Sequence, residues 1–249
     1  MNIFVCVSHV PDTTTKVQVG GDGKAIDPAG VTYILNPYDE YAVEAGLQLK
    51  EARGGEVTIV CVGPDAVKET IRKGLAMGAD KGLHVVAAEP RDSFGTAKAI
   101  ADALKDRAAD VVFCGRQSID YDGWQMSGLL GEMLSIPSVS VAAKLDIAED
   151  GSFTAERDIE GGQETITSKL PAVISAQKGL NEPRYPKLQG IMQAKRKPIE
   201  DVEPVPYENR VEVLEMSKPP IKEAGKIVGE GPDAVKELVR LLHEEAKVI

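Results

Sequence analysis

Residues 57–86 read VTIVCVGPDAVKETIRKGLAMGADKGLHVV and contain the simplest strand–helix–strand unit of the chain. The runs Val57–Val62 and Leu83–Val86 are short and apolar on both faces. Between them, residues 67–75 place apolar side chains on one helical face, and Gly78 follows where that helix should stop. Strands that are apolar on both faces are typical of a parallel sheet that helices cover on both sides.

The same alternation of strand and helix continues on both sides of this unit. The sequence predicts further strands at 3–7, 110–114 and 172–176, and further amphipathic helices at 38–52, 97–104 and 126–133. We therefore predict an α/β fold with a doubly wound, mainly parallel sheet of the adenine-nucleotide-binding type. The expected strand order is 3-2-1-4-5.

Two segments depart from this alternation. Between Lys144 and Thr167 the apolar period changes to two around the turn Asp150-Gly151, which predicts a small antiparallel excursion. An earlier insertion, residues 16–27, is expected to form another hairpin around its glycine-rich centre.

The composition changes after Lys197. Five of the 15 prolines lie between residues 198 and 220, and the same stretch is acidic, so we expect an extended arm without a core. The arm should end in a helix at about 232–246 with one apolar stripe, formed by Val235, Leu238, Val239 and Leu242. We predict a nucleotide-binding domain over 1–197, including a recognition segment at 182–197, followed by an arm and helix over 198–249. The stripe could fold back on its own domain or dock on another chain.

Charge and composition exclude several classes of protein. The net charge of −10, the pI near 4.9 and the aromatic content of 4% disfavour binding to nucleic acid. No apolar run is long enough for membrane insertion, and the strand-like residues 2–7 leave no room for a targeting signal at the start. The three cysteines lack CxxC spacing, so we expect buried thiols and a cytoplasmic location.

The motifs of common enzymes are missing from the sequence. There is no glycine-rich dinucleotide fingerprint, no P-loop and no nucleophile elbow, and the three histidines are far apart. We therefore predict no catalytic residues and no metal site. Binding or carriage fits the sequence better than turnover.

One dense polar stretch, residues 115–126, joins the fourth strand to the fourth helix. A helix start offers free N–H groups and a partial positive charge, which suit a phosphate. Asp120 and Asp122 would repel a phosphate, so they should cap the helix or bond neighbouring amides. The alternative is an ordinary capped loop without a ligand.

The predicted strand order brings four segments to one edge of the sheet. Residues 6–8 and 115–120 should line the crevice between the first and fourth strands, with 36–39 and 62–63 facing the same edge. Together these segments predict a site of nucleotide size.

Five motifs occur in an order that resembles the beta subunit of electron transfer flavoproteins over nearly the whole chain. They are Asn36-Pro-Tyr-Asp-Glu-Tyr-Ala-Val-Glu, Ala76-Met-Gly-Ala-Asp80, Gly115-Arg-Gln-Ser-Ile-Asp-Tyr-Asp122 with Gln125, Leu170-Pro-Ala-Val173 and Asn181-Glu-Pro-Arg-Tyr185. The resemblance implies an electron carrier rather than an enzyme. It also implies a heterodimer with an alpha subunit that holds most of the FAD.

The resemblance further implies that this subunit binds a structural AMP and contributes contacts near the flavin. The implied cofactor-binding residues are Cys6, Asn36, Pro37, Tyr38, Asp39, Val62, Gly115, Arg116, Gln117, Ser118, Ile119, Asp120, Tyr121, Asp122, Gly123, Trp124, Gln125 and Met126. They coincide with the crevice expected from the strand order.

Partner contacts are implied at two places. The arm and its helix resemble the segment that wraps onto the alpha subunit. Leu188, Ile191 and Met192 fall on one face of a short predicted helix. That face could pack on its own domain, but the resemblance favours a contact for flavin dehydrogenases such as acyl-CoA dehydrogenases. An acceptor oxidoreductase would then take the electrons.

Two other functions stay open. In a flavin-bifurcating relative a second FAD replaces the AMP, and the loop typically reads Asp-Gly-Asp-Thr-Ala-Gln. This chain has Asp120-Tyr-Asp-Gly-Trp-Gln125, which is closer to the AMP-binding form. A stand-alone nucleotide-binding regulatory domain would explain the crevice but not the long arm.

Overall fold

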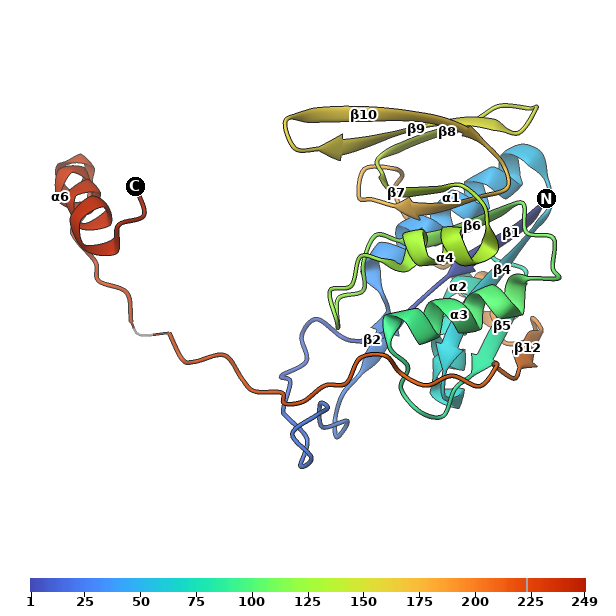
Figure 1. The fold of residues 1–249 in the computed structure, drawn as a ribbon, viewed down its shortest axis with the longest axis horizontal. Helices are drawn as coiled ribbons and strands as arrows, with labels where there is room; N and C mark the ends of the chain where they lie inside the picture. The colour runs from blue at the N-terminus through green and yellow to red at the C-terminus, as the bar shows by residue number, and fades with distance from the viewer. Residues whose placement is uncertain (223) are drawn as a thin grey trace.

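A seven-stranded parallel sheet forms the centre of the protein in a computed structural model that describes residues 1–222 and 224–249 (Figure 1). Its order is β12-β5-β4-β1-β6-β11-β7, so the five strands expected from the sequence follow the order 3-2-1-4-5 as predicted. The strands are β1 (Asn2–Cys6), β4 (Glu56–Gly63), β5 (Lys81–Val86), β6 (Val111–Gly115), β7 (Ser138–Ala142), β11 (Ala172–Ala176) and β12 (Ile199–Val202).

Helices cover both faces of this sheet, which confirms the doubly wound α/β class. One face packs against α1 (Pro37–Arg53) and against α2 (Lys68–Met77), which η1 (Asp65–Val67) precedes. The opposite face packs against α3 (Ser93–Leu104) and α4 (Met126–Leu134). The buried apolar residues of the sheet divide between these two layers, because side chains alternate along a strand. The short helix α5 (Leu188–Ala194) lies against α2.

The antiparallel excursion has the predicted position. It consists of β8 (Lys144–Ile147), β9 (Ser152–Ile159) and β10 (Gly162–Lys169), and Phe153 and Ala155 of β9 are buried in the layer that contains α1. The hairpin expected at residues 16–27 is reduced to a single bridge between Val19 and Ile26. The glycine-rich turn lies within a longer loop. The two ends of this loop are joined by the antiparallel pairing of β2 (His9–Pro11) with β3 (Tyr33–Leu35).

The arm begins inside the sheet. Its first residues form β12, which pairs in parallel with β5, and Asp201 of β12 accepts a hydrogen bond from the buried His84 of β5 at 2.9 Å. Further along, the ring of Tyr207 stacks on Phe94, and Asp92 accepts a hydrogen bond from the amide of Arg210 at 2.6 Å. The arm therefore stays fastened to the body well beyond residue 198.

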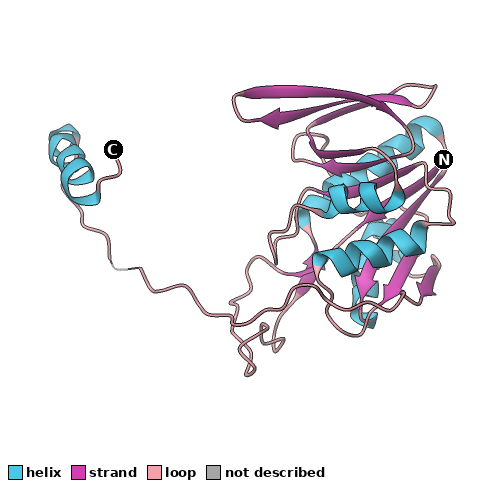
Figure 2. Cartoon of the chain, viewed as in Figure 1, coloured by secondary structure: helices cyan, strands magenta, loops and turns pink. Residues whose placement is uncertain are grey.

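Past Lys218, the described residues of the arm make no hydrogen bond or ion pair with the body. The chain runs out to η2 (Pro232–Ala234), α6 (Val235–Leu241) and η3 (Leu242–Ala246), which lie apart from the sheet (Figures 1 and 2). The apolar stripe on α6 is exposed, since Val235 keeps 53% and Val239 47% of its surface accessible. It does not fold back on its own domain. Among the described residues, no helix has the length and apolar character needed to cross a membrane.

Candidate functional site

A buried carboxylate joins the two strands at the switch point of the sheet. Asp39, in the first turn of α1, is only 3% exposed. Its Oδ2 accepts a hydrogen bond from the amide of Ser8 at 2.7 Å, and its Oδ1 accepts one from the amide of Gly115 at 3.0 Å. Residue 115 must be glycine for this contact, because a Cβ there would overlap Asp39 Oδ1. The segments that follow β1 and β6 are thus held at a fixed spacing.

The environment of Asp39 changes its acidity. Burial raises its pKa to about 7, against the lowering effect of hydrogen bonds from the amides of Ser8 and Gly115 and from the Asn36 side chain. A buried carboxylate with a raised pKa at the carboxyl ends of two central strands is typical of a functional site.

Asn36 has a different role from the one that its position suggests. It occupies the N-cap position of α1, followed by Pro37, but its side chain makes no capping hydrogen bond. Instead its Nδ2 donates to the carbonyl of Gln117 at 2.8 Å, and its Oδ1 accepts from the amide of Ile119 at 3.3 Å. The completely buried side chain therefore holds the 115–126 loop rather than the helix.

Arg116 is sandwiched between two aromatic rings at the same edge. Its guanidinium carbon lies 4.5 Å from the ring centroid of Tyr38 and 4.4 Å from that of Trp124. Its Nη2 donates to the Tyr38 hydroxyl at 3.1 Å, and its Nη1 donates to Gln177 Oε1 at 3.2 Å. Gln177, directly after β11, was not predicted from the sequence. The stack ties α1, the loop and the strand edge together.

The two acidic residues of the loop leave the start of α4 free. Asp120 accepts from the amide of Tyr121 at 2.8 Å, and Asp122 accepts from Gln117 Nε2, so both bond groups within the loop. Neither caps α4, whose N-cap residue Gln125 also makes no side-chain capping bond. The first amides of α4 are therefore available to an anion.

Two polar atoms of the loop have unmet bonding capacity. Arg116 Nε and Gln117 Oε1 are buried without a hydrogen-bond partner among the described residues. Unpaired buried donors and acceptors are costly, and in native proteins they call for a specific cause. An unpaired donor and an unpaired acceptor on consecutive residues fit a loop that gains partners from a ligand.

The other residues of the implied cofactor site lie around this centre. Cys6 ends β1 and is buried, and burial raises the pKa of its thiol. Val62 lies near the end of β4, the neighbour of β1. Tyr121 is exposed, and the remaining residues, Ser118, Gly123 and Met126, are partly buried in the loop and at the start of α4.

The candidate partner residues form an exposed apolar face on α5. Leu188 is 76% exposed, Ile191 45% and Met192 63%, whereas Ala194 is buried against the domain. A Cβ at Gly190 would lie 2.5 Å from the carbonyl oxygen of Ala76, so α5 approaches α2 closely on that side. The three apolar side chains therefore do not pack on their own domain.

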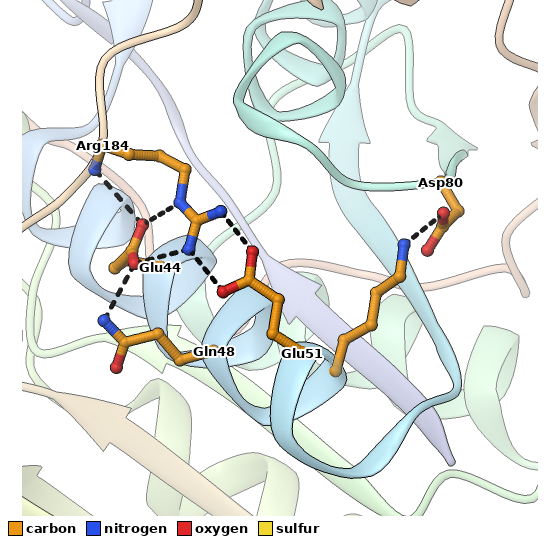
Figure 3. A network of polar contacts seen from close by, with 6 residues as sticks. Glu44, Gln48, Glu51, Asp80 and Arg184 are labelled. Carbon is orange, nitrogen blue, oxygen red and sulfur yellow. Dashed lines mark hydrogen bonds and ion pairs between the residues drawn. The ribbon is translucent and has the colours of Figure 1, made fainter.

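An ion-pair network joins the segment before α5 to α1, and it was not predicted from the sequence. Arg184 binds the carboxylates of Glu44 and Glu51, both on α1 (Figure 3). Glu44 and Arg184 each belong to a motif quoted above, in residues 36–44 and 181–185. No feature of either motif indicates that the two residues meet, because 140 positions separate them.

Comparison with known proteins identifies the family. The sequence model of the family described as "Electron transfer flavoprotein domain" matches residues 24–206 of this chain. An electron transfer flavoprotein subunit beta from Bacillus subtilis is 40% identical, with both chains covered completely. A Bradyrhizobium diazoefficiens protein of the same name is 38% identical and an Arabidopsis thaliana mitochondrial one 36% identical, again over all of both chains. The chain belongs to the beta subunits of the electron transfer flavoprotein family, which carry electrons.

Proposed function

We propose that this chain pairs with an alpha subunit to form a heterodimeric electron carrier between flavin dehydrogenases and an acceptor oxidoreductase. In this proposal the chain binds AMP structurally and helps to hold an FAD that lies mostly on the alpha subunit. The observation that carries the proposal is the meeting of Asn36, Asp39 and residues 115–119 at the switch point of the sheet.

The residues at this edge fit an adenine nucleotide. The uncapped start of α4 suits a phosphate, and the unmet acceptor Gln117 Oε1 suits an amino group such as that of adenine. Asp39 does not compete with the phosphate, because its two oxygens already face the amides of Ser8 and Gly115. The flavin would supply the redox chemistry, while this chain positions and encloses it.

AMP is favoured over a second FAD by the fixed position of Trp124. Its ring lies over the Arg116 guanidinium, which also lies over the Tyr38 ring, so the three side chains occupy space beside the 115–126 loop. A bifurcating carrier would need room for a second isoalloxazine ring beside this crevice. The stack supports the smaller ligand.

The two exposed apolar faces support two different partners. The stripe on α6 stands at the end of a long arm, which suits a wrap around the alpha subunit. Leu188, Ile191 and Met192 lie on the body itself, which suits a contact with a dehydrogenase. A cytoplasmic location remains part of the proposal, supported by three buried cysteines that form no disulfide.

The test uses the heterodimer purified after co-expression of this chain with its alpha subunit. We expect an acyl-CoA dehydrogenase and its acyl-CoA substrate to bleach the flavin absorbance, and an acceptor oxidoreductase to restore it. A heterodimer whose flavin is reduced by dithionite, but by none of a panel of flavin dehydrogenases, would contradict the proposed function.

A further inference from the structure

The segment that follows β11 and includes α5 is fastened to the body on both sides of residues 185–193. It leaves the sheet after Ala176, crosses α1 and reaches α2, where α5 lies. Two of its apolar side chains, Tyr185 at 93% and Leu188 at 76% exposure, point away from the body. An isolated helix of seven residues is marginal in water, so the fastenings must fix the orientation of α5.

The first fastening is Arg184. Its Nε and Nη2 donate to the two oxygens of Glu44 at 2.8 and 2.9 Å, and its Nη1 and Nη2 donate to those of Glu51 at 2.5 and 3.1 Å (Figure 3). The backbone amide of Arg184 also donates to Glu44 at 3.2 Å. Only the planar, five-donor guanidinium can bind two carboxylates in this way, because a lysine offers a single point charge.

Glu44 makes this fastening strong. Its side chain is 4% exposed, and Gln48 Nε2 donates a further hydrogen bond to it at 2.9 Å. Burial alone would raise the pKa of Glu44, but hydrogen bonds from Arg184 and Gln48 hold that pKa below its ordinary value. A buried carboxylate that lost Arg184 would be left unpaired at a high cost.

The second fastening holds the far end of α5. Arg72 of α2 donates to the carbonyls of Ala194 and Lys197, each at 2.5 Å. In return, Lys197 Nζ donates to the carbonyls of Leu75 and Ala79, at the end of α2, at 3.0 and 2.5 Å. Residues 185–193 thus bridge two helices of the body with both ends fixed.

We propose that Arg184 is a positioning residue for partner recognition: it sets the direction in which Leu188 is presented to the dehydrogenase. This inference rests on the proposed function. Leu188 begins α5 only four residues after Arg184, so a loose first fastening would let Leu188 sample many directions while α5 stays attached through Arg72 and Lys197. Binding to the dehydrogenase would then cost the entropy of ordering the segment.

The test is a double-mutant cycle in the heterodimer with Arg184→Met and Leu188→Ala. We expect Arg184→Met to raise the KM for the flavoprotein in the acyl-CoA dehydrogenase assay by about tenfold with little change in kcat. In the Leu188→Ala background, Arg184→Met should raise this KM by less than about twofold, because Arg184 acts through Leu188. If the KM of the double variant rises by the product of the two single-variant effects, the inference is wrong.

The controls separate positioning from a general loss of structure. Arg53→Met removes an arginine of α1, the helix that carries Glu44 and Glu51. Arg53 donates to the carbonyls of Ile147 and Ala148, so its loss should leave the KM unchanged. Glu51→Gln keeps the buried pair with Glu44 and should give a smaller rise in KM than Arg184→Met, with wild-type melting temperature. A KM that rises only in step with a lower melting temperature or a lower flavin content would also overturn the inference.

Failure of the two proposals can be distinguished. If the wild-type heterodimer accepts electrons from the dehydrogenase and Arg184→Met behaves like Arg53→Met, only the positioning role is wrong. If the wild-type flavin is reduced by dithionite alone, the proposed function is wrong and this inference falls with it.

Discussion

The carboxylate of Asp39 is almost fully buried, yet it is the group that joins the two central strand ends of the candidate site. Its pKa of about 7 in the folded chain lies above its ordinary value of 3.8. Between these two values the folded state binds more protons than the unfolded state. The contribution of Asp39 to stability is therefore complete at low pH and is lost as the pH rises towards 7.

Asp39→Asn removes this titration. We expect the unfolding free energy of the wild type, relative to the variant, to fall between pH 5 and 7 by up to about 1.4 kcal/mol per pH unit. Urea unfolding at pH 5, 6, 7 and 8 measures the difference. Two curves that stay parallel over this range would show that Asp39 does not titrate there.

Asp39 and the amides of Ser8 and Gly115 that bind it form a clamp between the two strand ends. Gly115 is the second residue on which this clamp depends. Gly115→Ala places a Cβ against Asp39 Oδ1, so we expect a loss of about 1–3 kcal/mol in stability together with a lower AMP content. Gly128→Ala on α4 is the matched control, because no atom lies within 4 Å of its added Cβ. Thermal melting and extracted-nucleotide analysis compare the two. Equal behaviour of the two variants would contradict the clamp.

Leu188 tests the recognition surface at a single position. Leu188→Ala should lower electron transfer from the dehydrogenase by about thirtyfold or more, since a buried interface anchor contributes about 2 kcal/mol or more. The melting temperature and the AMP and FAD contents should stay at wild-type values, because the side chain is 76% exposed in the free chain. Ile159→Ala, an exposed apolar residue on β9, is the control. An unchanged transfer rate would show that Leu188 is not the anchor.

At the scale of elements, the apolar strands were the most predictable part of the fold. Five strands and the main helices follow from apolar periodicity and from Gly78 at a helix end. The edge strands β7 and β12 were missed. Ser138–Ala142 follows Pro137 and contains two serines, and Ile199–Val202 lies in an acidic, proline-rich stretch that suggests an extended arm.

The contacts of β12 explain why an acidic segment can join the sheet. Asp201 pairs with Lys68 and with His84, and Glu200 pairs with Arg107. These partners lie more than 90 positions away in the sequence, so no local pattern could show them. The clamp of Asp39 and the Arg184 network were unpredictable for the same reason. The sequence indicated which segments converge, but not which atoms bond.

Two truncations separate the fastened part of the arm from its free part. Removal of residues 219–249 should leave the melting temperature near that of the full chain and abolish co-purification with the alpha subunit. Removal of 198–249 also deletes β12 and leaves the buried His84 without Asp201, so we expect a loss of about 2 kcal/mol or more. Melting curves and size-exclusion chromatography with the alpha subunit provide the readouts. Retained binding after removal of 219–249 would contradict the docking role of α6.

At the scale of the whole molecule, the chain divides its surface between tasks. The body carries the 115–126 loop at the carboxyl edge of the sheet and the apolar face of α5, while the arm carries α6 well away from the body (Figure 1). This separation would suit the carrier proposed above, with the alpha subunit on the arm and a dehydrogenase on α5.

The central claim is that this chain contributes an AMP site to a heterodimer that carries one flavin. The most direct measurement is the nucleotide content of the heterodimer after denaturation, by chromatography with absorbance detection against protein concentration. The structure of the 115–126 loop and the position of Trp124 predict one FAD and one AMP per heterodimer. Two FAD and no AMP per heterodimer would contradict the account and support the bifurcating alternative.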